Sequence, residues 1–180
     1  MLTMTMARAL SRGDGELCVE SADVEEAASI VALRDAAAMW QQQRGTHQWT
    51  PGEVTIEQVT AQITAGEWHV VRSGAAVLAA LRVLEADPEV WGRPDDAALY
   101  VHGLVIDRAV GGQGVGARLL QWVEQRAQGS ARQWVRLDCV ASNEQLRDYY
   151  ARHGFEVVGS RSFTNGWSAV TLLEKRVLRP

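Results

Sequence analysis

Cysteine and long apolar segments are scarce in this chain of 180 residues, and each shortage excludes a class of protein. The two cysteines, Cys18 and Cys139, lie far apart without C-x-x-C spacing, so neither a disulfide framework nor a zinc site is indicated. Both are expected to be core thiols, and no metal is expected. No segment approaches the roughly 18 consecutive apolar residues that a membrane-spanning helix needs, so we expect no membrane partner.

An excess of basic charge is also missing. The formal net charge is −4, which disfavours a nucleic-acid surface, because such a surface normally carries a Lys/Arg stripe. The first 15 residues contain no sustained apolar stretch of the kind found in a secretory signal. We therefore expect a flexible segment over residues 1–15, one domain over residues 16–180, a cytoplasmic location, and a monomer or homodimer.

The first half of the chain alternates between helical and strand patterns. A short strand is predicted at residues 16–22, followed by a helix capped by Asp23 and running to about Gln43. A second helix is predicted over residues 55–67, with Ile56, Val59 and Ile63 on one face. Strands are then expected at residues 68–72, 76–86 and 99–106, with a loop at residues 90–98.

The second half contains a strand, a helix and a strand that predict one parallel βαβ unit. The helix follows residue 115, and the second strand spans residues 133–140. Ser142 is predicted to cap a further helix, with Gln145 completing a capping box and Gly154 ending it. Two terminal strands, at residues 155–163 and 168–178, form a hairpin. The predicted class is α+β: a mixed, mostly antiparallel sheet with one crossover and flanking helices.

Four of the six residues from Gly111 to Gly116 are glycine, directly before a predicted helix. A nucleotide P-loop is excluded, because it requires lysine and then Ser or Thr after its last glycine, whereas Gly116 is followed by Ala117 and Arg118. Consecutive backbone N–H groups at a helix start bind anions, and glycine lets a phosphate approach them. The pyrophosphate of coenzyme A has the matching chemistry.

A dinucleotide cofactor is the competing interpretation of this turn. Gly112, Gly114 and Ala117 match the fingerprint G-x-G-x-x-A, with Asp138 about 20 residues later. However, residues 107–111 separate the strand from the first fingerprint glycine, whereas this turn is tight in dinucleotide-binding folds. The roughly 40 residues after Asp138 also cannot build the remaining parallel strands. We therefore favour the pyrophosphate of coenzyme A.

Residues 104–155 resemble the core of the GNAT N-acetyltransferase superfamily. The resemblance rests on the strand end "LVI", the turn "GGQGVG" and the segment "ASNEQLRDYYARHGF", where Asn143, Tyr150, Gly154 and Phe155 stand at the family's spacing. It implies direct transfer of an acetyl group from acetyl-CoA, as co-substrate, to an amine of a small molecule or peptide. The family's turn usually opens with Arg or Gln, and this chain has Gly111 there.

The resemblance also implies which residues bind acetyl-CoA. The strand end would hydrogen-bond the pantetheine arm and polarise the thioester carbonyl, the turn would wrap the pyrophosphate, and further contacts would come from the following helices. The implied cofactor-binding residues are Leu104, Val105, Ile106, Gly112, Gln113, Gly114, Val115, Gly116, Ala117, Arg118, Asn143 and Arg147.

Proton transfer in this reaction needs an acid for the leaving thiolate and a base for the attacking ammonium. The spacing of the family motif selects Tyr150 as the acid, with a place in the core as its structural alternative. Two candidates remain open for the base. Asp138 matches the position of a catalytic glutamate in some relatives, notably ribosomal-protein alanine acetyltransferases, and His102 lies on the strand that leads into the turn, two residues before Leu104.

Acceptor specificity is expected to depend on variable segments rich in tryptophan. The candidate substrate-binding residues are Trp40, His47, Trp49 and Trp91. Tryptophans near a cleft indicate an aromatic-lined pocket, although packing in the core explains them equally well. A catalytically silent module that binds acyl-CoA as a sensor, or that binds another protein, remains the alternative function. Tyr150 and the two candidate bases favour an enzyme.

Overall fold

The computed structural model describes residues 18–92 and 97–177. The segment expected to be flexible, residues 1–15, lies outside the described residues. By their contacts, the described residues form two compact units. The first unit comprises residues 18–39, 49–82 and 103–122, and the second comprises residues 40–48, 83–92, 97–102 and 123–177. One domain over residues 16–180 stays a prediction.

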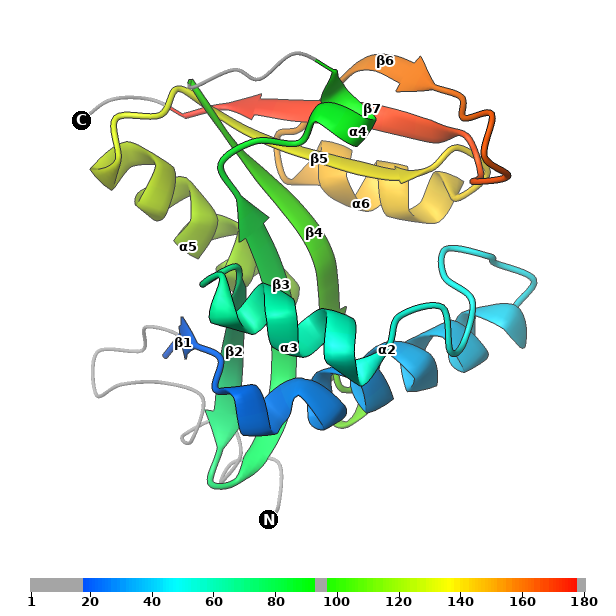
Figure 1. Ribbon diagram of the computed structural model, residues 1–180. Helices are drawn as coiled ribbons and strands as arrows, with labels where there is room; N and C mark the ends of the chain where they lie inside the picture. Colours follow the sequence, from blue (N-terminus) through cyan, green and yellow to red (C-terminus); the bar gives the residue numbers. More distant parts are fainter. Residues whose placement is uncertain (1–17, 93–96, 178–180) are drawn as a thin grey trace. The chain divides into compact units, whose positions relative to one another are not determined.

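Helices and strands alternate as the sequence predicts (Figure 1). The helical elements are η1 (Val24–Glu26), α2 (Ala27–Gln42), α3 (Ile56–Thr64), α4 (Pro88–Trp91), η2 (Arg108–Val110), α5 (Val115–Gly129) and α6 (Glu144–Arg152). The strands are β1 (Glu20–Ser21), β2 (Trp68–Ser73), β3 (Ala76–Leu84), β4 (Ala98–Ile106), β5 (Trp134–Val140), β6 (Glu156–Arg161) and β7 (Val170–Arg176).

The strands form one sheet in the order β1-β2-β3-β4-β5-β7-β6. The pair β4 and β5 is parallel and is joined through α5, whereas β1–β2, β2–β3, β5–β7 and β6–β7 are antiparallel. This topology confirms the predicted α+β class with its single parallel crossover. The sequence did not predict that β7 lies between β5 and β6, as Figure 1 shows for the orange and red strands.

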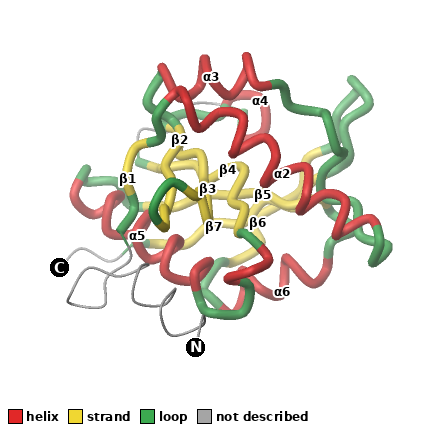
Figure 2. The backbone as a smooth tube through the Cα atoms, turned by 90° about the horizontal axis from the view of Figure 1, so that it is seen from below, coloured by secondary structure: helices red, strands yellow, loops and turns green. Residues whose placement is uncertain are grey.

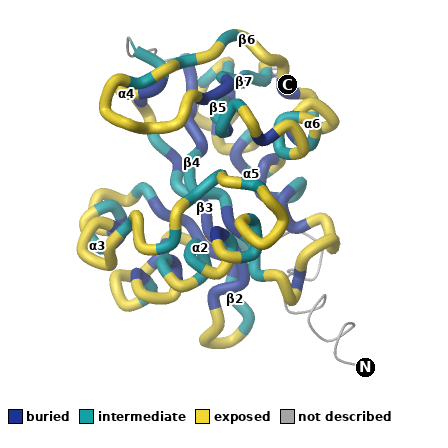
Figure 3. The backbone as a smooth tube through the Cα atoms, turned by 90° about the vertical axis from the view of Figure 1, so that its right-hand side faces the viewer, coloured by how far each residue is buried: buried dark blue, intermediate teal, exposed yellow. Residues whose placement is uncertain are grey.

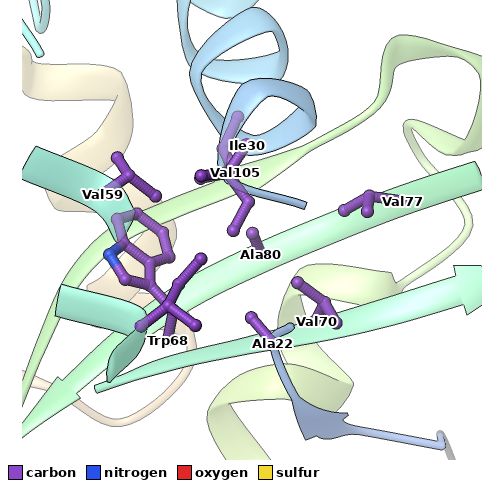
Figure 4. Close-up of a cluster of buried hydrophobic side chains, with 10 residues drawn as sticks. Ala22, Ile30, Val59, Trp68, Val70, Val77, Ala80 and Val105 are labelled. Carbon is purple, nitrogen blue, oxygen red and sulfur yellow. The ribbon is translucent and has the colours of Figure 1, made fainter. Parts of the chain in front are cut away.

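The core of the first unit forms where α2 and α3 cover β2 and β3, both helices lying on the same side of these strands in Figure 2. Trp68 and Val59 lie against each other, while Ile30 and Val105 point toward Ala80 (Figure 4). The indole N–H of Trp68 donates a hydrogen bond to the Gln62 side chain at 2.8 Å, so the ring buries its polar atom with a partner. Figure 3 accordingly colours β2 and β3 mainly as buried.

The second unit contains β5, β7 and β6. β5 alternates strictly between buried and partly buried residues, as a strand with one covered face does. β6 is the outer strand and is largely exposed, with Val157 and Val158 about half accessible. A register shift in β6 between Val157 and Gly159 bends this edge, a feature that protects an outer strand from pairing with other chains.

Several local predictions are wrong. The predicted loop at residues 90–98 begins inside the short helix α4, because Asp87 caps it and Pro88 favours the first helical position. Asn143, and not Ser142, is the N-cap of α6: its side chain accepts from the Leu146 N–H at 3.1 Å. Ile56 is exposed although Val59 and Ile63 are buried, because it stands at the first helical position of α3.

Within the described residues, no helix has both the length and the apolar character needed to cross a bilayer. Cys139 is fully buried, as expected of a core thiol, whereas Cys18 is only partly buried.

The substitution Gly103→Ala tests the packing of β4 on the first core. Gly103 has φ 58°, and an added Cβ would lie 2.8 Å from the buried ring of Trp68. We expect a loss of about 1–3 kcal/mol in the free energy of unfolding, measured by urea denaturation. Gly66→Ala is the control, because Gly66 also has positive φ but open space around it. Equal losses in both variants would contradict the packing argument.

Candidate functional site

The glycine turn before α5 exposes backbone, as an anion site requires. Gly112 and Gly114 both have φ 75°, a conformation that glycine adopts without strain, and nothing lies within 4 Å of a Cβ built at either residue. The first helical hydrogen bond of α5 runs from the Arg118 N–H to the Gly114 carbonyl. The N–H groups in the first turn of an α-helix have no intrahelical acceptor, and here they belong to residues 115–117. The turn therefore fits a phosphate group.

Arg108 lies beside the glycine that departs from the family pattern. A Cβ built at Gly111 would lie 3.5 Å from a guanidinium nitrogen of Arg108, so this cation lies next to the start of the turn. Asp107 holds the preceding η2 turn, since its side chain accepts from the Ala109 N–H at 2.8 Å. No local sequence signal marks Arg108, because its contact with Gly111 depends on the tight 3₁₀ turn of residues 108–110.

In the second unit, the parallel pairing of β4 with β5 ends at Val101 and Leu137. His102 and Asp138, the next residues on the two strands, approach each other through their side chains. His102 Nδ1 lies 3.6 Å from Asp138 Oδ1, which is too long for a hydrogen bond. Asp138 Oδ1 is buried and has no hydrogen-bond partner within the described part of the chain. The structure therefore brings the two candidate bases together.

Asp87 completes this cluster from the start of α4. Its Oδ2 lies 3.0 Å from His102 Nε2, and its side chain is only 7% exposed. Burial raises the pKa of Asp138, nearby His102 lowers it, and the like charge of Asp87 raises it further. The net shift is upward, so the Asp138 carboxyl keeps its proton to a higher pH than an ordinary aspartate does.

The side chains of this cluster could also serve as ligands of a metal ion. Asp87, His102 and Asp138 each offer a ligand atom, all within 4.8 Å of one another. Carboxylate and imidazole ligands suit several divalent cations. The 3.0 Å contact between His102 Nε2 and Asp87 Oδ2 is also within hydrogen-bonding distance, so these two side chains can share a proton.

Tyr150 lies on the buried face of α6. It is 6% exposed, and its ring packs edge-on against Phe155 with centroids 5.8 Å apart. Burial raises the pKa of the Tyr150 phenol, and nearby Cys139 and Asp138 act in the same direction. The phenol therefore stays protonated at neutral pH, and the raised pKa makes it a weaker acid than an exposed tyrosine.

Gln48 connects the segment after α2 with the start of α6. Its Oε1 accepts from the Val140 N–H at 3.1 Å and from the Asn143 side-chain amide at 3.2 Å. Asn143 is thereby fixed at both ends of its amide, since its oxygen caps α6. Sequence patterns predict a role for the neighbours His47 and Trp49 but not for Gln48, because the partners of Gln48 lie more than 90 residues away in sequence.

The remaining predicted residues divide between the two units. At the end of β4, Val105 is buried in the first core, and Leu104 and Ile106 are partly buried. Arg147 on α6 pairs with exposed Glu144 at 3.4 Å. These positions leave the predicted backbone contacts of residues 104–106, and a phosphate contact of Arg147, as predictions.

The tryptophan residues have packing partners of their own. The Arg34 guanidinium lies 4.7 Å from the Trp49 ring in the first unit. In the second unit, Trp40 packs under Arg44 at 4.2 Å and Trp91 under Arg136 at 5.0 Å, whereas His47 is exposed. A role of these side chains in acceptor binding stays a prediction.

A family model and a relative of known sequence both match this chain, and both are acetyltransferases. The model of the acetyltransferase (GNAT) domain matches residues 45–173. The chain is 34% identical over 163 residues to an uncharacterised N-acetyltransferase of Bacillus subtilis, YesJ, covering 85% of this chain and 86% of that protein.

Solved structures show the same fold. A GNAT-family acetyltransferase from Listeria monocytogenes superposes with a TM-score of 0.71 at 24% identity, covering 92% of this chain and 98% of that one. A putative acetyltransferase from Salmonella typhimurium, solved with its cofactor acetyl-CoA, has a TM-score of 0.66 at 16% identity, covering 91% and 95% of the two chains. From the matched family model and the Bacillus relative, the chain belongs to the GNAT acetyltransferase family.

Proposed function

We propose that this protein is an N-acetyltransferase that moves the acetyl group of acetyl-CoA directly onto an amine of a small molecule or peptide. The observation that carries the amine specificity is the buried Asp138 oxygen beside His102, since a cationic amine must lose a proton before it attacks. The proposal is supported by the name of the Bacillus relative, an N-acetyltransferase, and by the acetyl-CoA bound to the Salmonella protein.

Acetyl-CoA binding is assigned to the turn before α5. The open N–H groups of residues 115–117 suit the pyrophosphate, and the positive end of the α5 dipole favours its negative charge. Arg108 adds a cation beside Gly111 and so supplies the charge that this position lacks. When bound, acetyl-CoA supplies the activated acyl group.

Proton transfer is assigned to the second unit. The Asp138 and His102 pair accepts the proton of the amine, and the amine nitrogen then forms a bond to the acetyl carbon. The bond from this carbon to sulfur breaks, and the Tyr150 phenol protonates the leaving thiolate. The second proton on the substrate nitrogen then passes to the Tyr150 phenolate, which restores the phenol and leaves the neutral amide. Cys139 is no alternative nucleophile, because burial raises the pKa of its thiol to about 11, which favours direct transfer over an acyl-enzyme.

The first experiment is release of CoA thiol from acetyl-CoA by the purified protein, with aliphatic diamines, amino sugars, amino acids and peptides with free N-termini as acceptors. Thiol release that depends on one amine class supports the proposed function. Binding of acetyl-CoA with no turnover on any amine would instead support a silent acyl-CoA-binding module.

Tyr150→Phe is expected to lower kcat by about 10²-fold or more, because the leaving thiolate loses its proton donor. The affinity for acetyl-CoA, measured by calorimetry, should not change. Tyr149→Phe is the control, because it removes the phenol next in sequence, which packs edge-on against Tyr150. An unchanged kcat in Tyr150→Phe removes this residue from the mechanism.

Arg108→Ala is expected to raise the KM for acetyl-CoA by about tenfold, a loss of about 1.4 kcal/mol, while kcat stays the same. The effect should shrink at high salt, because the contact is between an exposed cation and a phosphate. Arg108→Lys keeps the charge and should restore most of the affinity. A KM that does not respond to Arg108→Ala would contradict its assignment to the pyrophosphate.

The pH dependence of kcat/KM for the amine tests Asp138. Activity should fall as the pH drops through the raised pKa of Asp138, above the range of about 4 that is usual for aspartate, because the protonated carboxyl cannot accept a proton. Asp138→Asn should lower kcat/KM by about 10²-fold or more and remove this acidic limb. Asp148→Asn, an exposed carboxylate on α6, should leave the profile unchanged.

A further inference from the structure

Asp87 is a buried carboxylate with two partners, and no sequence motif drew attention to it. One oxygen accepts from the Val90 N–H at 3.2 Å and so caps α4. The other lies 3.0 Å from His102 Nε2. A carboxylate that is 7% exposed is costly to bury unless hydrogen bonds offset the loss of water, and here both oxygens are bonded.

The short helix α4 is held in place by an aromatic and ionic assembly. The Trp91 ring lies edge-on to Tyr100, with centroids 5.9 Å apart, and the Arg136 guanidinium lies 5.0 Å over Trp91. Arg136 is itself fixed by Glu174 at 3.0 Å and by the Tyr100 hydroxyl at 3.2 Å. Asp87 is therefore anchored at its cap and through the far end of its helix.

The contact with Asp87 determines where His102 carries its proton. An ionised carboxylate only accepts hydrogen bonds, so His102 Nε2 must be the donor. In the neutral ring, Nδ1 then has a free lone pair, and this atom faces Asp138 Oδ1 at 3.6 Å. These two acceptor atoms face each other with no proton between them, so a proton that binds one of them is attracted by the other.

We propose that Asp87 is a positioning residue that fixes the tautomer of His102, so that His102 Nδ1 and Asp138 Oδ1 together take up one proton from the substrate amine. The last part of this statement rests on the proposed function. One N–H bond of the substrate ammonium group breaks, and its proton binds His102 Nδ1 on the side that faces Asp138 Oδ1. The electron pair left on nitrogen forms the bond to the acetyl carbon as the carbon–sulfur bond breaks, and the thiolate leaves to be protonated by Tyr150. Asp87 touches no reacting atom and acts only through His102.

Nitrogen NMR of the imidazole ring tests the tautomer without any turnover. The long-range proton–nitrogen spectrum of the neutral ring distinguishes a protonated from an unprotonated nitrogen, and loss of signals in His102→Gln identifies His102 among the four histidines. We expect protonated Nε2 and unprotonated Nδ1 in the wild-type protein. The opposite tautomer in the wild-type protein would overturn the proposal.

Asp87→Asn is the decisive variant. The new amide can still cap α4 through its oxygen, but its NH₂ group donates to His102 Nε2 and moves the ring proton to Nδ1. We expect the reversed tautomer and a fall in kcat of about 10²-fold or more, with an unchanged KM for acetyl-CoA. Glu89→Gln, which neutralises an exposed carboxylate on the same helix, should change neither the spectrum nor kcat.

A second variant keeps the test valid if Asp87→Asn is unstable. Asp87→Ser retains an oxygen that can cap α4 but cannot reach His102, so kcat should again fall while the fold is kept. A reversed tautomer in Asp87→Asn with full kcat would overturn the positioning role. If the wild-type protein acetylates no amine but shows the expected tautomer, the proposed function fails while the link from Asp87 to His102 stands.

Discussion

The end of the β4–β5 pairing is the constraint on which the candidate site depends. Pairing stops at Val101 and Leu137, so the next residues, His102 and Asp138, interact through side chains. β5 continues to pair with β7 as far as Val140, which keeps Asp138 on a rigid strand with a buried carboxylate. Val140 lies beyond the part of β5 that pairs with β4. Its N–H donates to the Gln48 side chain, so this backbone donor has a partner.

This constraint has an electrostatic consequence. Asp138 Oδ1 is buried without a hydrogen-bond partner among the described residues, so ionising this carboxyl costs folding free energy. The raised pKa of Asp138 reflects that cost. The same property makes Asp138 a better proton acceptor near neutral pH than an exposed aspartate. His102 offsets part of the cost, and Asp87 orients His102. The burial of Asp138 thus lowers the stability of the protein when the carboxyl is ionised, and the same burial makes the carboxylate a stronger base.

The features predictable from sequence are those with local causes. The turn at Gly112 and Gly114 was recognisable because positive φ and a following helix both leave signals within a few residues. The parallel crossover was predictable for the same reason. The position of β7 was not, because a strand order depends on which edges remain open after the hairpins form. The sequence predicts Ser142 as the cap of α6 because two adjacent residues can both cap, whereas a distant contact with Gln48 favours Asn143.

Asp87 shows the limit of sequence reasoning about the site. The pair Asp87 and Pro88 is a typical helix start, and that signal could have predicted α4. Nothing local indicates that the second oxygen of Asp87 faces His102, because that contact depends on Trp91 and Arg136 holding α4. Sequence patterns offer Asp138 and His102 only as separate alternatives for the base, whereas the register of β4 and β5 brings the two side chains together.

The most direct test of the account is the pH profile of kcat/KM for a series of acceptor amines that differ in their own pKa. If Asp138 and His102 take the amine proton within the protein, the acidic limb stays at the same pH for every amine, because it reports a group of the protein. A limb that moves with the pKa of each amine would mean that the amine loses its proton in solution, and would contradict the assignment of a base to this cluster.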